Sequence, residues 1–167
     1  MQVISGAFDT LSHAMETYLG NSDQDNVSGD VALAIMKNTV VNMRRLLVNI
    51  DDMQARSNLM WDSAMAENGI LKCGRLTDFQ AHQMEHQLGA HTDCNHGQGL
   101  AVIHPVYYRH IVKDAPEKFE LFAKEVLRKV ADSCNIIKCN PRELDHEEIY
   151  QIFMECLYKE VRDITYM

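Results

Sequence analysis

The chain has 167 residues, a length that suits one compact domain, and 46% of them are hydrophobic. Its formal net charge of −8 argues against nucleic acid as a partner, because phosphate binding requires a basic surface. The chain has no apolar run of about 18 residues, and its first residues lack the charged start and apolar core of a secretory signal. We therefore expect no membrane partner and predict a cytoplasmic protein.

Apolar residues recur with the helical period of 3.6, and the alternation typical of strands is nearly absent. We predict an all-α fold, a bundle of about seven helices. The first expected helix covers residues 5–19 and ends at Gly20, and the second begins near Asp30, its expected N-cap. The third covers residues 52–67 and ends at Asn68 and Gly69. The fourth begins with a capping box from Thr77 to Gln80 and ends near Gly89. The last three are a helix after His96, limited or kinked by Pro105; residues 116–133; and residues 146–161, capped by Asp145.

Core, cysteine and motif patterns add few functional signals. Four methionines and the one tryptophan are predicted to fill the core, although the tryptophan could also line a substrate cleft: Met36, Met43, Met53, Met60 and Trp61. The five cysteines are irregularly spaced, which favours reduced thiols; Cys134 and Cys139 do not form a CxxC pair. Neither GxGxxG nor GxxxxGK[ST] occurs, so these residues have no evident place to hold a dinucleotide.

Two histidine-containing segments have the spacing of metal ligands. Asp9 and His13 are four residues apart, as are His82 and His86, so each pair projects from one helical face. His96 follows ten residues after His86, where a new helix is expected. Each pair taken alone is more typical of a solvated helix surface than of a metal site. The other candidates in these segments and beyond are expected to be bystanders: His91, Asp93, Cys94, His104, His110 and His146.

The segments GAFDTLSHAMETY and HQMEHQLGAHTDCNHGQGLAVIHP resemble the iron-containing (group III) metal-dependent alcohol dehydrogenases, in their butanol dehydrogenase-like branch. The resemblance continues through NMRRLLVNIDDMQARSNLMWDSAMAENGIL and so covers most of the chain. It implies that residues 1–167 form the single helical, metal-binding C-terminal domain of a dehydroquinate synthase-like or iron-type alcohol dehydrogenase. The N-terminal NAD(P)-binding domain of the family is expected to be absent.

The resemblance also implies roles for individual residues. The DxxxH motif and the HxxxH…HG motif carry the metal ligands in this family, which here are Asp9, His13, His82 and His96; His86 is implied to relay protons. One carboxylate and three imidazoles suit Fe²⁺ or Zn²⁺ and leave room for a substrate oxygen. The implied reaction is hydride transfer between a small alcohol or aldehyde and NAD(P).

Three hypotheses remain open at this point. The chain is a fragment or truncated form of a dehydrogenase, inactive alone, or a free-standing, non-enzymatic metal-binding or interaction module derived from that family. The third is a structural bundle whose histidines bind nothing. An apolar face left uncovered by a missing domain would predict contact with a separate nucleotide-binding domain or a homo-oligomer.

Overall fold

The computed structural model describes residues 2–20, 26–77, 79–132, 144–152 and 154. The chain divides into two compact units, Met1–His110 and Ile111–Met167, which are described separately. The elements are α1 (Gln2–Leu19), α2 (Val27–Val48), α3 (Met53–Glu67), η1 (Ile70–Lys72), α4 (Gln80–Thr92), α5 (His96–Ile111), η2 (Val112–Asp114) and α6 (Pro116–Asp132). The predicted all-α fold is confirmed.

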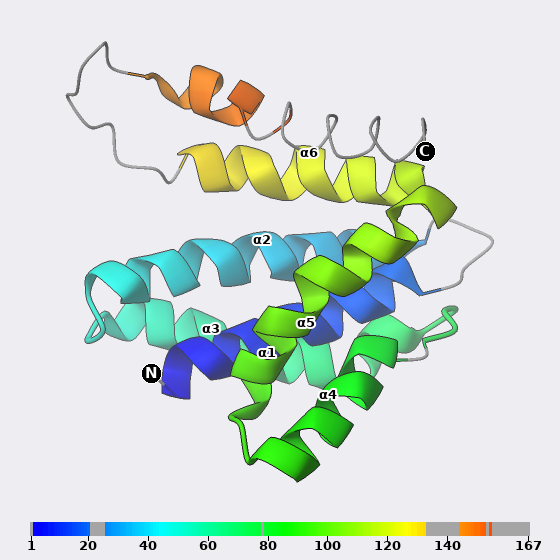
Figure 1. Ribbon diagram of the computed structural model, residues 1–167. Helices are drawn as coiled ribbons and strands as arrows, with labels where there is room; N and C mark the ends of the chain where they lie inside the picture. The colour runs from blue at the N-terminus through cyan, green and yellow to red at the C-terminus, as the bar shows by residue number, and fades with distance from the viewer. Residues whose placement is uncertain (1, 21–25, 78, 133–143, 153, 155–167) are drawn as a thin grey trace. The chain divides into compact units, whose positions relative to one another are not determined.

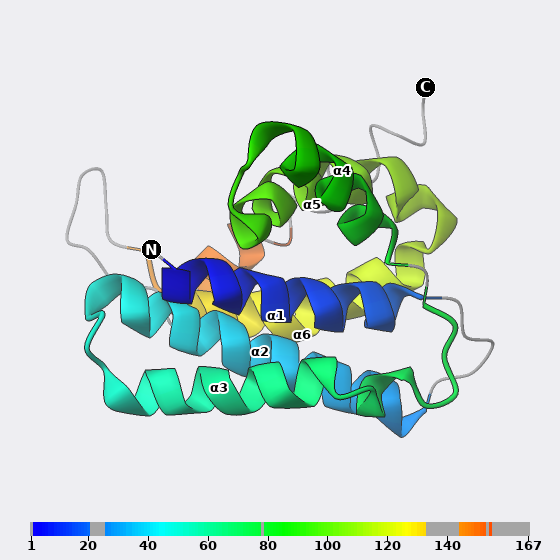
Figure 2. The ribbon, with the colours of Figure 1, turned by 90° about the horizontal axis from the view of Figure 1, so that it is seen from below.

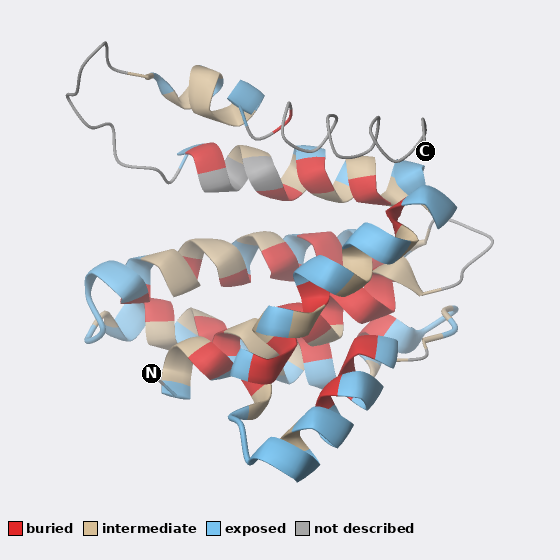
Figure 3. Cartoon of the chain, viewed as in Figure 1, coloured by how far each residue is buried: buried red, intermediate tan, exposed pale blue. Residues whose placement is uncertain are grey.

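Helix α1 is the central element of the first unit (Figures 1 and 2). Helices α1, α2 and α3 run in alternating directions across the view of Figure 1, and α1 packs against both of the other two. Helices α4 and α5 lie on the opposite side of α1 from α2 and α3, as the view from below shows (Figure 2). This arrangement buries α1 along most of its length, whereas α4 keeps an exposed outer face (Figure 3).

Two stripes of side chains on α1 explain its central position. Ala7, Leu11, Ala14 and Tyr18 are spaced at i, i+4, i+7 and i+11, so they share one face, and all four are buried. Ala7 belongs to a core cluster with residues of α2 and α3: Leu46, Ala55 and Leu59, flanked by Val3, Ile4 and Met43. A second stripe carries the polar residues Asp9, His13 and Glu16. Helix α1 therefore packs into the core through one stripe and carries ionisable side chains on the other.

Some helix ends differ from the predicted ones. The N-cap of α2 is Asn26, whose side chain accepts a hydrogen bond from the backbone of Gly29, so the prediction of Asp30 as the cap was wrong. The predicted capping box of α4 was also wrong, because Phe79 precedes the helix with φ 51° and makes no side-chain cap. Helix α4 continues through Gly89 as far as Thr92. Helix α1 begins at Gln2, three residues before its predicted start.

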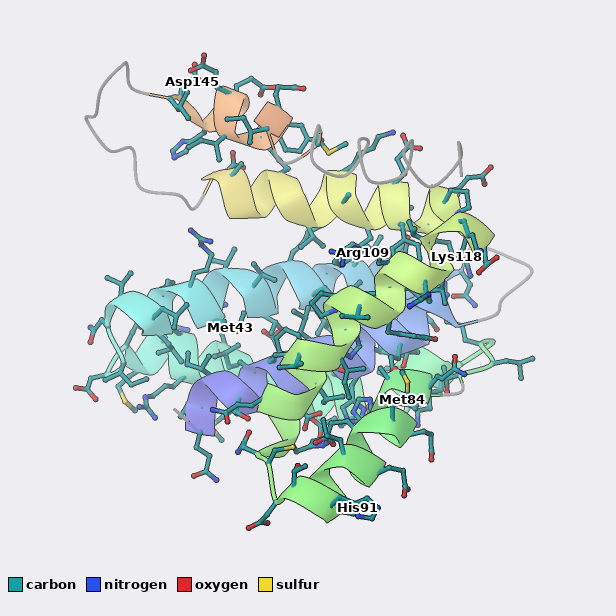
Figure 4. The ribbon with its side chains drawn as sticks, in the orientation of Figure 1. Met43, Met84, His91, Arg109, Lys118 and Asp145 are labelled. Atoms are coloured by element: carbon teal, nitrogen blue, oxygen red, sulfur yellow. The ribbon has the colours of Figure 1, made fainter. Side chains whose placement is uncertain are left out.

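The methionine prediction was partly correct. Met36 is fully buried in α2, and Met43, labelled in Figure 4, packs at the edge of the core cluster. Met53 and Met60 are 74% and 76% exposed, and Trp61 is 68% exposed. These three side chains of α3 point away from the core, so the core prediction was wrong for them.

Replacing Met36 by alanine is expected to lower the free energy of unfolding by about 2–5 kcal/mol, because the truncation leaves a cavity in a closely packed interior. The matched control is Met60→Ala, the same substitution on an exposed face, which should change stability by no more than about 0.5 kcal/mol. Urea denaturation of both variants measures the difference. Equal effects would show that Met36 does not support the core.

The second unit contains η2 and α6, and residues 146–152 begin another helix. Asp145 caps that helix as predicted: its carboxylate accepts from the backbone N–H of Glu148, and the Glu148 carboxylate accepts from the N–H of Asp145. Cys134, Cys139 and half of the predicted last helix lie outside the described residues. Among the described helices, none is long and apolar enough to cross a membrane.

Candidate metal centre

All five predicted site residues lie close together in the first unit, on three helices. Asp9 and His13 occupy successive turns of α1, and His82 and His86 occupy successive turns of α4. His96 is the first residue of α5. Because the two residues of each pair are four positions apart, their side chains project from the same face of their helix, as predicted.

One carboxylate oxygen is the common point of the four predicted ligands. Asp9 Oδ1 lies 3.3 Å from His82 Nε2, 3.3 Å from His96 Nε2 and 3.6 Å from His13 Nε2. The ring centroids of His13 and His82 are 4.4 Å apart, and those of His82 and His96 are 5.3 Å apart. Each imidazole thus presents its Nε2 atom to the same carboxylate. Ligand atoms of Asp9, His82 and His96 all lie within 4.8 Å of one another, which is compatible with one shared ion.

His86 lies beside this group on its solvent side. Its ring stacks on that of His96, with centroids 5.4 Å apart and an interplanar angle of 29°. Its centroid is 6.0 Å from that of His82. The residue is exposed, unlike buried His82. This position suits a group that exchanges protons with water rather than one enclosed by the protein.

Two buried glutamates contact the outer nitrogens of the histidines, and the sequence did not predict either role. Glu16 Oε2 lies 2.7 Å from His82 Nδ1, and Glu16 Oε1 accepts from the backbone N–H of Ala81 at 2.5 Å. Glu85 Oε2 contacts Nδ1 of His96. Histidines that bind metals almost always donate their other ring N–H to such an acceptor, which fixes the tautomer and the ring orientation. Glu16 and Glu85 each follow a candidate ligand by three residues, but each contacts a histidine of another helix, so this spacing did not indicate either role.

The electrostatics follow from these contacts. Burial alone would lower the pKa of His82, but its hydrogen bonds with Asp9 and Glu16 outweigh burial and raise the pKa to about 9. Burial lowers the pKa of His13. Burial tends to raise the pKa of Asp9, yet the hydrogen bond with His82 and the charges of the neighbouring histidines lower it overall. Asp9 is therefore an anion at neutral pH and available to a cation.

We call Asp9 and the three histidines near its Oδ1 atom (His13, His82 and His96) the Asp9 group. The remaining candidate residues do not belong to it. His91 lies at the exposed C-terminal end of α4 (Figure 4), and His110 is also exposed. Asp93 is the C-cap of α4 with φ 55°, and Cys94 is an exposed free thiol. His104 is buried in α5, where its Nε2 contacts Ser12 Oγ, and burial lowers its pKa to about 4. It is therefore a neutral core histidine.

The donor atoms fit a divalent transition metal. The carboxylate of Asp9 and the imidazoles of His82 and His96 supply mixed oxygen and nitrogen donors of the kind that suit Fe²⁺ or Zn²⁺. His13 Nε2 lies 3.6 Å from Asp9 Oδ1 but is not among the atoms that lie within 4.8 Å of one another. The contacts of His82 and His96 with Glu16 and Glu85 leave the Nε2 atoms of both rings directed at Asp9 Oδ1.

Comparison with known proteins identifies the family. Residues 3–138 match the Fe-containing alcohol dehydrogenase family, C-terminal, and the chain therefore belongs to this family. It is 35% identical over 113 residues to NADH-dependent butanol dehydrogenase A of Clostridium acetobutylicum, covering 68% of this chain and 29% of that protein. It is 26% identical over 107 residues to the NADPH-dependent aldehyde reductase YqhD of Escherichia coli, covering 64% of this chain and 28% of that protein.

A solved structure shows the same likeness. The crystal structure of NADH-dependent butanol dehydrogenase A from Thermotoga maritima superposes with a TM-score of 0.71 and 28% sequence identity. The match covers 96% of this chain and 37% of that one. The chain thus spans about 30% of the length of the curated relatives it matches.

Proposed function

We propose that this chain is the metal-binding catalytic domain of an NAD(P)-dependent alcohol dehydrogenase acting on small alcohols or aldehydes, as butanol dehydrogenases do. Asp9, His13, His82 and His96 would hold Fe²⁺ or Zn²⁺. The observation that carries this proposal is the convergence of three histidine Nε2 atoms within 3.3–3.6 Å of Asp9 Oδ1. Membership of the Fe-containing alcohol dehydrogenase family supports it.

The residues around the proposed metal site would have different roles in the reaction. A bound metal would supply a Lewis acid at the substrate oxygen, and NAD(P) would supply the hydride acceptor or donor. Asp9 provides the negative charge that balances a cation, and Glu16 and Glu85 orient two of the histidines. Exposed His86, stacked on His96, would pass a proton between the substrate oxygen and water.

The nucleotide would be bound by residues other than these 167, because no Gly-rich phosphate-binding motif occurs among them. We propose a separate nucleotide-binding domain as the partner, with a homo-oligomer as the alternative. Either would cover apolar side chains that α3 exposes, including Met53, Met60 and Trp61. The chain alone is then an inactive form of the enzyme.

The experiment that tests this function measures metal, nucleotide and turnover separately. Elemental analysis of the purified chain should find about one Fe or Zn per chain. Fluorescence titration with NADPH should show no micromolar binding, and butanal should not be reduced by the chain alone. Turnover should follow when the N-terminal part of the Clostridium acetobutylicum relative is supplied as a separate domain. A chain that takes up neither metal would refute the proposed site.

A non-enzymatic metal-binding module derived from the same family is the second candidate. It predicts the same metal content, since it keeps the same ligands. It differs in predicting no turnover with any supplied nucleotide-binding domain. The complementation assay therefore separates the two candidates.

A further inference from the structure

The carboxylate of Glu85 is enclosed at the junction of α4 and α5. The residue is 1% exposed, and its Oε2 contacts Nδ1 of His96. Its Oε1 lies 3.8 Å from the thiol of Cys94, in the segment between the two helices. The carboxylate is thus held between a histidine at the start of one helix and the loop that leads to it.

The His96 ring is more exposed than the His82 ring. The His96 side chain is 38% exposed and belongs to the first residue of α5, whereas the His82 side chain is 5% exposed and lies within α4. Ring packing from Phe79 and His13 also restrains His82. A carboxylate accepting from Nδ1–H of His96 leaves the lone pair on Nε2, the atom directed at Asp9.

A glycine provides the space that Glu85 occupies. A Cβ atom built on Gly99 would lie 2.6 Å from Glu85 Oε1, 2.8 Å from its Cγ and 3.1 Å from its Cδ. Gly89 is also close, since its Cβ would lie 3.3 Å from Oε1. Gly99 lies within α5 and has no positive φ, so its backbone conformation does not require glycine. Glycine is required at this position because the Glu85 side chain approaches the backbone so closely.

We propose that Glu85 is a positioning residue for His96, and that Gly99 acts through Glu85 by leaving room for its carboxylate. This inference rests on the proposed metal site. Any side chain at position 99 would displace Cγ as well as the terminal oxygens, so the carboxylate could not keep its contact with His96 Nδ1. His96 would then lose its fixed tautomer and ring orientation, although no ligand had been changed.

Cobalt titration of the purified chain tests the proposal, because the visible absorption of bound Co²⁺ reports ligand geometry independently of turnover. Glu85→Ala and Gly99→Ala should each weaken Co²⁺ binding by about 10- to 100-fold and alter the spectrum. Glu85→Gln keeps a neutral acceptor in the same volume, so its loss should be smaller than that of Glu85→Ala. Gly6→Ala is the matched glycine control: a Cβ there meets nothing within 4 Å, and binding should equal that of the unchanged chain.

The double variant Glu85→Ala/Gly99→Ala gives the sharpest result. Once the Glu85 side chain is gone, an added methyl group at position 99 has nothing to displace, so Gly99→Ala should cost no further affinity. Additive losses, or a Glu85→Ala chain that binds Co²⁺ with unchanged affinity and spectrum, would overturn the proposal. If Glu85→Ala does not fold by circular dichroism, the comparison of Glu85→Gln and Gly99→Ala with Gly6→Ala decides it: equal spectra for all three refute positioning. A wild-type chain that binds no Co²⁺ would refute the proposed metal site instead.

Discussion

Replacing His96 by alanine is expected to remove most of the stabilisation that a bound divalent metal gives this chain. A ligand present at a thousand times its Kd, and bound only by the folded state, raises the free energy of unfolding by about 4 kcal/mol. For a chain of this size that corresponds to a rise in Tm of about 8–16 °C. Zn²⁺ should produce this shift in the unchanged protein, and a chelator should reverse it.

The control for this substitution is another histidine of the same helical region. His91→Ala removes an exposed imidazole from the end of α4 that does not join the Asp9 group, so its zinc-dependent shift should equal that of the unchanged protein. Thermal denaturation with zinc, and again with chelator, measures both variants. A full zinc-dependent shift in His96→Ala would exclude His96 from the ligand set.

Metal affinity is expected to fall by about 100-fold between pH 8 and pH 6. Hydrogen bonds with Asp9 and Glu16 raise the pKa of His82 to about 9, against the effect of burial. A metal can bind this imidazole only after its proton leaves, so below pH 9 each unit of acidification costs about tenfold in affinity. Burial lowers the pKa of His13, so protonation of His13 opposes metal binding less than that of His82. Competition with a chelator of known affinity measures this dependence.

Glu16→Gln tests the cause of that pH dependence. The substitution removes the charge of Glu16 beside His82 Nδ1, so the pKa of His82 should fall and the dependence of affinity on pH should become shallower. Glu117→Gln removes an equal charge at the exposed start of α6 and should leave the slope unchanged. An equally steep slope in Glu16→Gln would mean that Glu16 does not hold the proton on His82.

Local patterns predicted the helices, and they predicted that Asp9 and His13, like His82 and His86, share a helical face, because both depend on spacing along one helix. The period of 3.6 residues places Asp9 and His13 on one face whatever surrounds them. The choice of helix cap depends on more distant contacts. Asn26, Ser28 and Asp30 are all good capping residues, but Asn26 and Ser28 also bond to the backbone of Cys73, more than forty residues away.

The roles of Glu16 and Glu85 could not be predicted for a related reason. A glutamate on a helix usually lies in water, and a single sequence does not show which of its faces another helix covers. Both residues are buried because α4 and α5 pack against the polar stripe of α1 and against each other. For Met53 and Met60 the error was the opposite: both were predicted to be buried and are exposed. An apolar residue on a helix does not by itself indicate burial.

On α1, the residues that pack into the core and the proposed metal ligands lie on separate stripes. Ala7, Leu11, Ala14 and Tyr18 pack into the core, while Asp9 and His13 lie on the other stripe, two residues out of phase. An exchange of the coordinating atoms, such as a softer sulfur ligand in place of Asp9, would leave the packed stripe unchanged. If the proposed site binds metal, we expect that its preferred ion can be changed by exchanging a ligand while the core residues of α1 stay the same.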